Sequence, residues 1–173
     1  MQAFSLVLLA LAAFSGCAMA DETSTAKKGP MTPVTALLTV HGEDGHEQQF
    51  NSAALAKLPQ QTVHAEAHGN AVTCSGPNLI EVVAAAGAPS GEKLRGRNLA
   101  LYVRVSAADG YRAVFALAEL DPGMRDAVPI VTDRCEGAAL DAKDGPFRIV
   151  VPGEKRPARW ARQVTSIDVL SAP

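Results

Sequence analysis

Short segments in which apolar and polar residues alternate, separated by turn residues, make up most of the chain after residue 34. Alternation with a period of two is typical of strands that have one buried face. Strands are therefore predicted over residues 35–42, 46–51, 62–68, 71–75, 99–107, 111–117, 127–133, 144–153 and 164–171. Because strands and helices do not alternate in a regular rhythm along the chain, the pattern predicts an α+β, mainly β domain with a few short helices.

Apolar residues at helical spacing predict two short helices. The first covers residues 53–58, with Ser52 as its N-cap. The second covers residues 79–87, with Asn78 as its N-cap and a glycine at its C-terminal end. Gly76 is expected to form the turn that leads into this second helix.

The opening of the chain has a different pattern from the rest. Residues 1–20 contain sixteen apolar residues and no charged side chain, in a run too short to span a membrane. We expect this segment to be a signal peptide that is cleaved after Ala20, which predicts a periplasmic protein. A lipoprotein signal that anchors the chain through Cys17 is the alternative. Residues 21–34 are expected to be a flexible leader, and residues 35–173 a single domain.

Export determines the expected state of the cysteines. Cleavage after residue 20 leaves Cys74 and Cys135, and an exported pair of cysteines meets an oxidising compartment. A disulfide between them is predicted, which closes a loop worth roughly 4 kcal/mol in the chain-entropy model. Two unrelated buried thiols are the alternative.

Composition and charge exclude several classes of protein. The chain has 173 residues, with 16 basic and 18 acidic side chains and a formal net charge of −2. This near balance argues against a dedicated nucleic-acid binder, which usually carries a strong basic excess. The chain also has no Ser-His-Asp order, no phosphate-binding glycine loop and no paired-carboxylate spacing that would indicate hydrolysis.

Six short motifs follow one another in the chain, and the resemblance that they carry covers residues 35–170. They are LTVHG at 38–42, LAKLP at 55–59, SGPNL at 75–79, ADGY at 108–111, GPFRIVVPG at 145–153 and RWAR at 159–162. In this order they resemble the sulfite-oxidase-fold, or molybdopterin-binding oxidoreductase, superfamily. The chain looks like a small, stand-alone member of it. The resemblance implies a sulfite-oxidase-like molybdopterin-binding fold.

The same resemblance implies where a molybdenum ligand would lie. Catalytic members hold molybdenum through a dithiolene cofactor and one cysteine thiolate, at the end of the strand before the SGPNL motif. The matching residues, 64–68, contain no cysteine, and Cys74 lies too close to Gly76 to take that role. We therefore expect an exported binding or accessory module without a molybdenum cofactor, which works with a redox or sensory protein partner. A periplasmic molybdopterin-dependent oxidoreductase or electron-transfer partner is the alternative.

Two histidines near Cys74 suggest a metal site as a further alternative. His64, Glu66 and His68 alternate along a predicted strand and would share one face of it. Imidazole and carboxylate groups are ligands for copper or zinc. The other interpretation is a polar, solvent-facing stripe beside a turn.

The region after residue 147 is basic. Arg148, Arg159 and Arg162 can bind phosphate or carboxylate groups, and Trp160 can stack on a flat ring. In the family this region lies near the anionic end of the pterin, so the resemblance implies a cofactor-binding role for these residues. The same role is considered for two residues of the ADGY motif, Asp109 and Tyr111. The alternatives are a solvated loop with Trp160 packed on the core, and an ordinary Asp-Gly hairpin turn.

Overall fold

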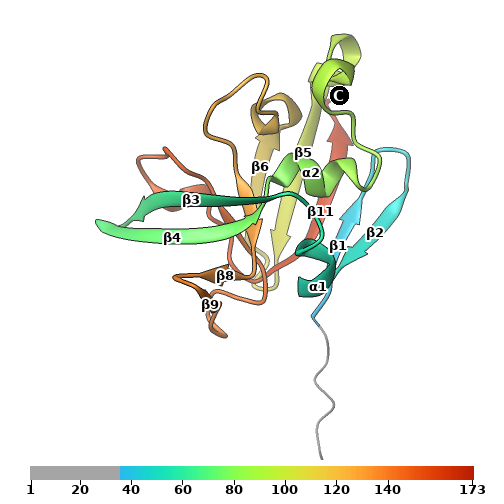
Figure 1. The fold of residues 1–173 in the computed structure, drawn as a ribbon. Coiled ribbons are helices and arrows are strands. Elements are labelled where there is room, and N and C mark those ends of the chain that lie inside the picture. The colour runs from blue at the N-terminus through green and yellow to red at the C-terminus, as the bar shows by residue number, and fades with distance from the viewer. Residues whose placement is uncertain (1–35) are drawn as a thin grey trace, which may run out of the picture. The chain divides into compact units, whose positions relative to one another are not determined.

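A five-stranded sheet forms the centre of the fold (Figure 1), in a computed structural model that describes residues 36–173. The strand order is β2-β1-β11-β5-β6. The strands are β1 (Leu38–His41), β2 (Glu47–Phe50), β5 (Leu101–Ala107), β6 (Arg112–Ala116) and β11 (Val164–Ser171). β1 pairs in parallel with β11, and the other neighbours are antiparallel. The first and last strands of the domain therefore lie side by side.

The predicted alternation accounts for the core. Along β5 each residue in turn is buried and then partly exposed, so one face of the sheet is apolar and the other faces solvent. The largest fully buried side chains come from this face and from the segments packed against it. They include Leu38, Leu79, Ile80, Leu94, Phe115, Leu117, Leu120, Ile130, Phe147, Ile149 and Ile167.

A second sheet has the order β3-β4-β8-β9 and packs beside a two-stranded sheet of β7 and β10. These strands are β3 (Gln60–Ala67), β4 (Asn70–Pro77), β7 (Ile130–Thr132), β8 (Arg134–Cys135), β9 (Ala138–Ala139) and β10 (Arg148–Val150). In Figure 1 the β3–β4 hairpin runs across the strands of the central sheet and projects beyond them. Its two turn residues, His68 and Gly69, both have positive φ, as a two-residue hairpin turn requires.

Helical segments are short. The α-helices are α1 (Ser52–Leu55) and α2 (Leu79–Ala84), and the 3₁₀ turns are η1 (Gly91–Lys93), η2 (Gly96–Ala100), η3 (Leu117–Leu120) and η4 (Pro157–Arg159). The prediction of Ser52 as N-cap of the first helix is wrong. The Asn51 side chain takes that place and accepts the Ala54 N–H at 2.8 Å. Asn78 is the N-cap of α2, but its side chain makes no capping bond.

Gly76 has a different role from the one predicted. It lies inside β4 rather than in a turn, and a β-carbon there would approach the Val131 carbonyl oxygen to 1.9 Å. Glycine is therefore required because β4 passes so close to the β7 backbone. Gly87 behaves as predicted, with a φ of 93° beyond the end of α2.

The predicted α+β, mainly β class is confirmed. Within residues 36–173 no helix is long and apolar enough to cross a membrane. The predicted signal peptide, the lipid anchor at Cys17 and the leader lie outside the described residues.

Candidate functional site

Five of the six residues predicted to bind a cofactor line a single cavity of about 420 Å³. They are Asp109, Tyr111, Arg148, Trp160 and Arg162. The other lining residues are His68, Lys143, Asp144, Pro157, Ala158 and Ala161. We call this space the arginine cavity. Residues from four separate parts of the chain meet in its wall.

The β5–β6 turn supplies one side of the arginine cavity. Asp109 accepts the Tyr111 backbone N–H at 2.9 Å, which is the ordinary role of an aspartate in a tight hairpin. The Tyr111 hydroxyl donates a hydrogen bond to the Ala158 carbonyl in η4. This bond joins the hairpin to η4, while the Tyr111 ring stays 46% exposed.

Two arginines share one carboxylate in this cavity. Asp144 lies 2.5 Å from Arg148 and 3.6 Å from Arg162. Arg162 is 48% exposed, whereas the Arg148 side chain is 15% exposed and its buried Nε has no hydrogen-bond partner. Lys143 adds a third cation, so the wall carries three basic side chains against Asp144 and Asp109. The cavity thus offers donors to an anion.

Trp160 contributes to the wall from within the core. It is 5% exposed, and its indole N–H donates to the Val151 carbonyl at 3.0 Å. The Arg148 guanidinium lies 5.5 Å from the centre of its ring. The structure therefore matches the interpretation of Trp160 as a core residue, with little free ring surface for a ligand.

Arg159 does not line the arginine cavity. Its guanidinium lies 2.8 Å from Glu119 and 2.6 Å from Glu154, and 4.5 Å from the centre of the Phe115 ring. Burial lowers the pKa of Arg159, but the hydrogen bonds and charges of the two glutamates outweigh burial and raise it above its ordinary value. Arg159 consequently ties together β6, η3 and the loop that joins β10 to η4.

The two histidines proposed as metal ligands point to different places. His64 lies on β3 and contacts the Thr73 hydroxyl at 3.1 Å through Nδ1. His68 is not on the strand, because the chain turns there with a φ of 53°. Its predicted place on one strand face with His64 is therefore wrong. Among the described residues, no three His, Cys, Asp or Glu side chains are arranged to hold a metal ion.

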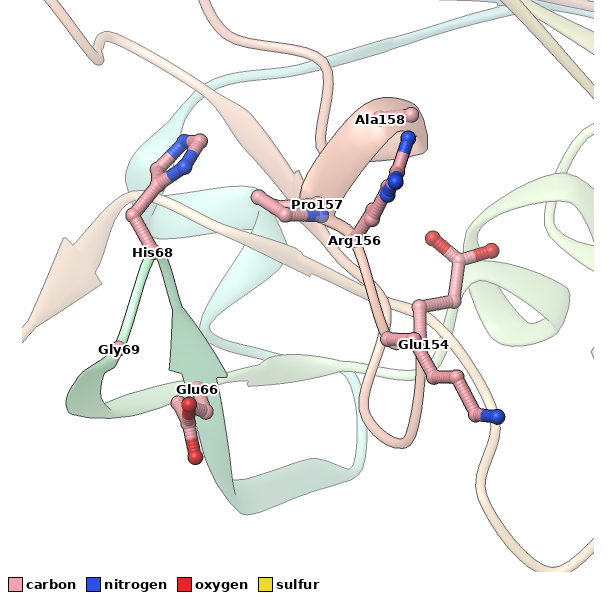
Figure 2. A pocket seen from close by; sticks show the side chains of 8 residues that line it. Glu66, His68, Gly69, Glu154, Arg156, Pro157 and Ala158 are labelled. Atoms are coloured by element: carbon pink, nitrogen blue, oxygen red, sulfur yellow. The ribbon is translucent and has the colours of Figure 1, made fainter.

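His68 instead stands between two cavities. Besides the arginine cavity, it lines a neighbouring cavity of about 510 Å³ with Glu66, Gly69 and residues 154–158. We call this second space the hairpin cavity. Figure 2 shows the β3–β4 turn on one side of it and residues 154–158 on the other.

Cys74 of β4 and Cys135 of β8 form the predicted disulfide. The two residues are directly opposite in the sheet, with a Cα–Cα distance of 4.1 Å. β3, where the resemblance implies a molybdenum ligand, contains no cysteine. The described residues therefore offer no free thiolate for molybdenum, and this donor set does not fit the cofactor.

Three polar residues of the arginine cavity were not predicted to belong to it, namely His68, Lys143 and Asp144. His68 was assigned to a metal site, because its strand assignment hid the turn. Lys143 and Asp144 lie before a Gly-Pro pair in a polar segment, which in a sequence is typical of an ordinary turn. Only their proximity to Arg148 and Arg162 in the fold gives them a role.

Comparison with known proteins identifies the fold. No family model matches the chain, and no curated protein matches it in sequence. Solved structures do match, and the class they indicate is the sulfite-oxidase-like fold expected from the sequence. One of them is the crystal structure of the sulfane dehydrogenase SoxCD from Paracoccus pantotrophus, with a TM-score of 0.60 and 19% identity. The match covers 79% of this chain and 38% of that one, so this chain spans well under half of that enzyme's length.

Proposed function

We propose that the chain is an exported binding domain of the molybdopterin-oxidoreductase fold that serves as an accessory module rather than as a molybdenum enzyme. The observation that carries this proposal is the pairing of Cys74 with Cys135, in a fold like that of a sulfane dehydrogenase. An enzyme of this class needs a thiolate on its metal, and a disulfide sulfur is not one. Its partner is a redox or sensory protein.

The arginine cavity is the binding site of the proposed module. Its cations suit a ligand with phosphate or carboxylate groups, and Arg162 is exposed enough to reach one. His68 offers a further hydrogen-bonding group, whereas the Tyr111 hydroxyl proton is already donated to the Ala158 carbonyl. An anion suits the charge of this cavity better than an apolar molecule does.

A molybdopterin-dependent oxidoreductase is the second candidate, and the likeness to a sulfane dehydrogenase favours it. The two candidates differ in metal content. We expect protein purified from a periplasmic fraction, under cofactor-replete conditions, to contain neither molybdenum nor a fluorescent pterin after oxidation. Stoichiometric molybdenum would overturn the proposal, and recovery of the protein from the cytoplasmic fraction alone would overturn export.

The anion site has a separate test. Calorimetric titration with inorganic pyrophosphate is expected to show binding that Arg162→Gln weakens about tenfold, because a charge-assisted hydrogen bond is lost. Arg134→Gln is the matched control, since Arg134 is 55% exposed, pairs with Asp133 and lies outside the cavity. Equal weakening by both substitutions would exclude the arginine cavity as the site.

A further inference from the structure

β3 is an edge strand that lacks the usual features that prevent pairing with another chain. It pairs with β4 on one side, and the sheet order places no strand on its other side. Natural edge strands are commonly short or carry lysine, proline or a bulge, which prevents other chains from pairing with them. β3 has eight residues, QQTVHAEA, and pairs with β4 in one uninterrupted register.

The register shows which backbone groups of β3 are free. In a hairpin with a two-residue turn, the flanking residues Ala67 and Asn70 exchange hydrogen bonds, and bonded and non-bonded pairs then alternate. His64 and Thr73 are therefore a non-bonded pair. Thr73 confirms this, because its N–H donates to the Glu136 side chain at 2.5 Å and its carbonyl accepts the Glu136 N–H at 2.7 Å. The N–H and C=O groups of Thr62, His64 and Glu66 thus point away from β4.

A groove follows β3. At one end is the hairpin cavity, next to Glu66 and His68. Further along β3 is a cavity of about 460 Å³, which we call the strand cavity. The strand cavity is lined by Gln61, Thr62, Val63, His64, Asn78, Pro122, Asp126, Ala127, Val128 and Pro152. Pro152 lines the strand cavity and residues 154–158 line the hairpin cavity, so one segment of the chain borders both. We call the two cavities together the β3 groove.

The two ends of the β3 groove differ in chemistry. The strand cavity presents apolar surface from Val63, Val128 and Pro152. The hairpin cavity presents Lys155 and Arg156, which are exposed and make no ion pair with any residue in 36–173. Of the two glutamates in the same lining, Glu154 is paired with Arg159, and Glu66 lies on β3 itself. An extended segment with apolar residues at one end and carboxylates at the other would complement this groove.

We infer that the β3 groove binds an extended acidic segment of a partner protein, which adds to the sheet as a strand beside β3. Main-chain hydrogen bonds to Thr62, His64 and Glu66 would supply affinity, and the two cavities would select side chains. A second copy of the chain fits less well, because the β3 strand that it would present carries a single carboxylate, Glu66. The inferred site rests on the proposed function only in requiring a protein partner.

Amide exchange provides the test. The probe is an acetylated and amidated peptide, Val-Thr-Val-Thr-Val-Asp-Glu-Asp, added to the mature protein labelled with ¹⁵N. We expect the amides of Thr62, His64 and Glu66 to exchange about tenfold more slowly when the peptide is bound, because they gain hydrogen-bond partners. The amides of Val63 and Ala65 already bond to β4 and should change little. No response, or an equal response of both sets, would overturn the inference.

Variants test separately the basic residues of the hairpin cavity and the free backbone groups of β3. Lys155→Glu with Arg156→Glu should weaken peptide binding about tenfold, whereas Lys57→Glu with Lys93→Glu, two exposed cations outside the groove, should not. His64→Pro removes an outward N–H, together with the exposed contact of the imidazole with Thr73, and should abolish the protection of Thr62 and Glu66 while the thermal unfolding curve is retained. The same peptide with N-methylated alternate residues should not bind.

Two results would contradict the inferred site while leaving the arginine cavity untested by them. The first is a dimer in sedimentation experiments without peptide, with the β3 amides already protected. The second is undiminished peptide binding by the His64→Pro variant. Pyrophosphate binding depends on Arg162 rather than on β3, so failure of the two proposals can be told apart.

Discussion

Neighbouring arginines in the RWAR motif serve different purposes. Arg162 pairs with Asp144 at the rim of the arginine cavity, whereas Arg159 points to Glu119 and Glu154. The 3₁₀ turn η4 ends at Arg159, so Arg162 lies beyond it and its side chain takes a different direction. Because the pKa of Arg159 is raised in the fold, its stabilising charge is fully present below its unfolded pKa. That contribution is lost only in strongly alkaline solution, as the pH rises through the folded pKa.

Removal of the Arg159 charge should therefore lower the stability of the fold at neutral pH. Arg159→Gln leaves two mostly buried glutamates without their shared partner, and we expect it to lower the free energy of unfolding by about 2 kcal/mol. Arg134→Gln, which breaks an exposed pair, should lower it by less than about 1 kcal/mol. Urea denaturation measures both values, and similar values for the two variants would contradict a structural role for Arg159.

At the scale of elements, the smallest hairpin depends on a covalent bond. β8 and β9 have two residues each, and isolated strands of that length are not stable. Pairing of Cys135 with Cys74 attaches this hairpin to β4, and Glu136 adds two hydrogen bonds to Thr73. The disulfide closes a loop with a sequence separation of 61 residues.

Loss of the disulfide should both destabilise the fold and free the hairpin. For Cys74→Ser with Cys135→Ser we expect a fall of about 3 kcal/mol in the free energy of unfolding. The amides of β8 and β9 should show the largest increase in exchange. The unmodified protein in reducing buffer is the control, and it should show the same loss of stability and the same increase in amide exchange as the double variant. Thiol titration of unfolded, unreduced mature protein should detect no free thiols. Detection of two free thiols would show that the disulfide does not form.

Sequence patterns predicted the long elements of this fold and missed those that depend on tertiary contacts. The hairpin at Asp109 and the strands around it follow from local alternation and turn chemistry. β8 and β9 carry no such signal, because a disulfide rather than a pattern holds them. The role of Gly76 was misassigned because the requirement for glycine comes from the Val131 carbonyl, which is distant in sequence. Five residues of the arginine cavity were predicted one by one. Nothing in the sequence indicated that Arg159 lies outside this cavity or that Lys143 lines it.

At the scale of the molecule, the last strand of the chain is needed to join the first strand to the rest of the central sheet. β11 lies between β1 and β5, in the middle of the central sheet, and its buried residues include Val164, Ile167 and Val169. The domain therefore cannot form its central sheet until nearly the whole chain is present. Folds dominated by such distant contacts generally fold slowly.

Truncation should show this dependence directly. A chain that ends at Arg162 lacks β11, and we expect it to lose cooperative thermal unfolding followed by circular dichroism, because β1 and β5 lose their shared neighbour. A chain that ends at Ala172 retains all of β11 and should unfold like the full chain. A sharp transition in the shorter chain would mean that the other strands form a stable sheet without β11.

The wall between the two cavities has a thermodynamic consequence. His68, Pro157 and Ala158 line both the arginine cavity and the hairpin cavity, which is one end of the β3 groove. An anion on one side and a peptide strand on the other would contact the same three residues from opposite sides. By linkage, any factor by which the anion changes the affinity for the strand equals the factor by which the strand changes the affinity for the anion. Through this shared wall, the proposed module would report the presence of a bound anion to its proposed protein partner.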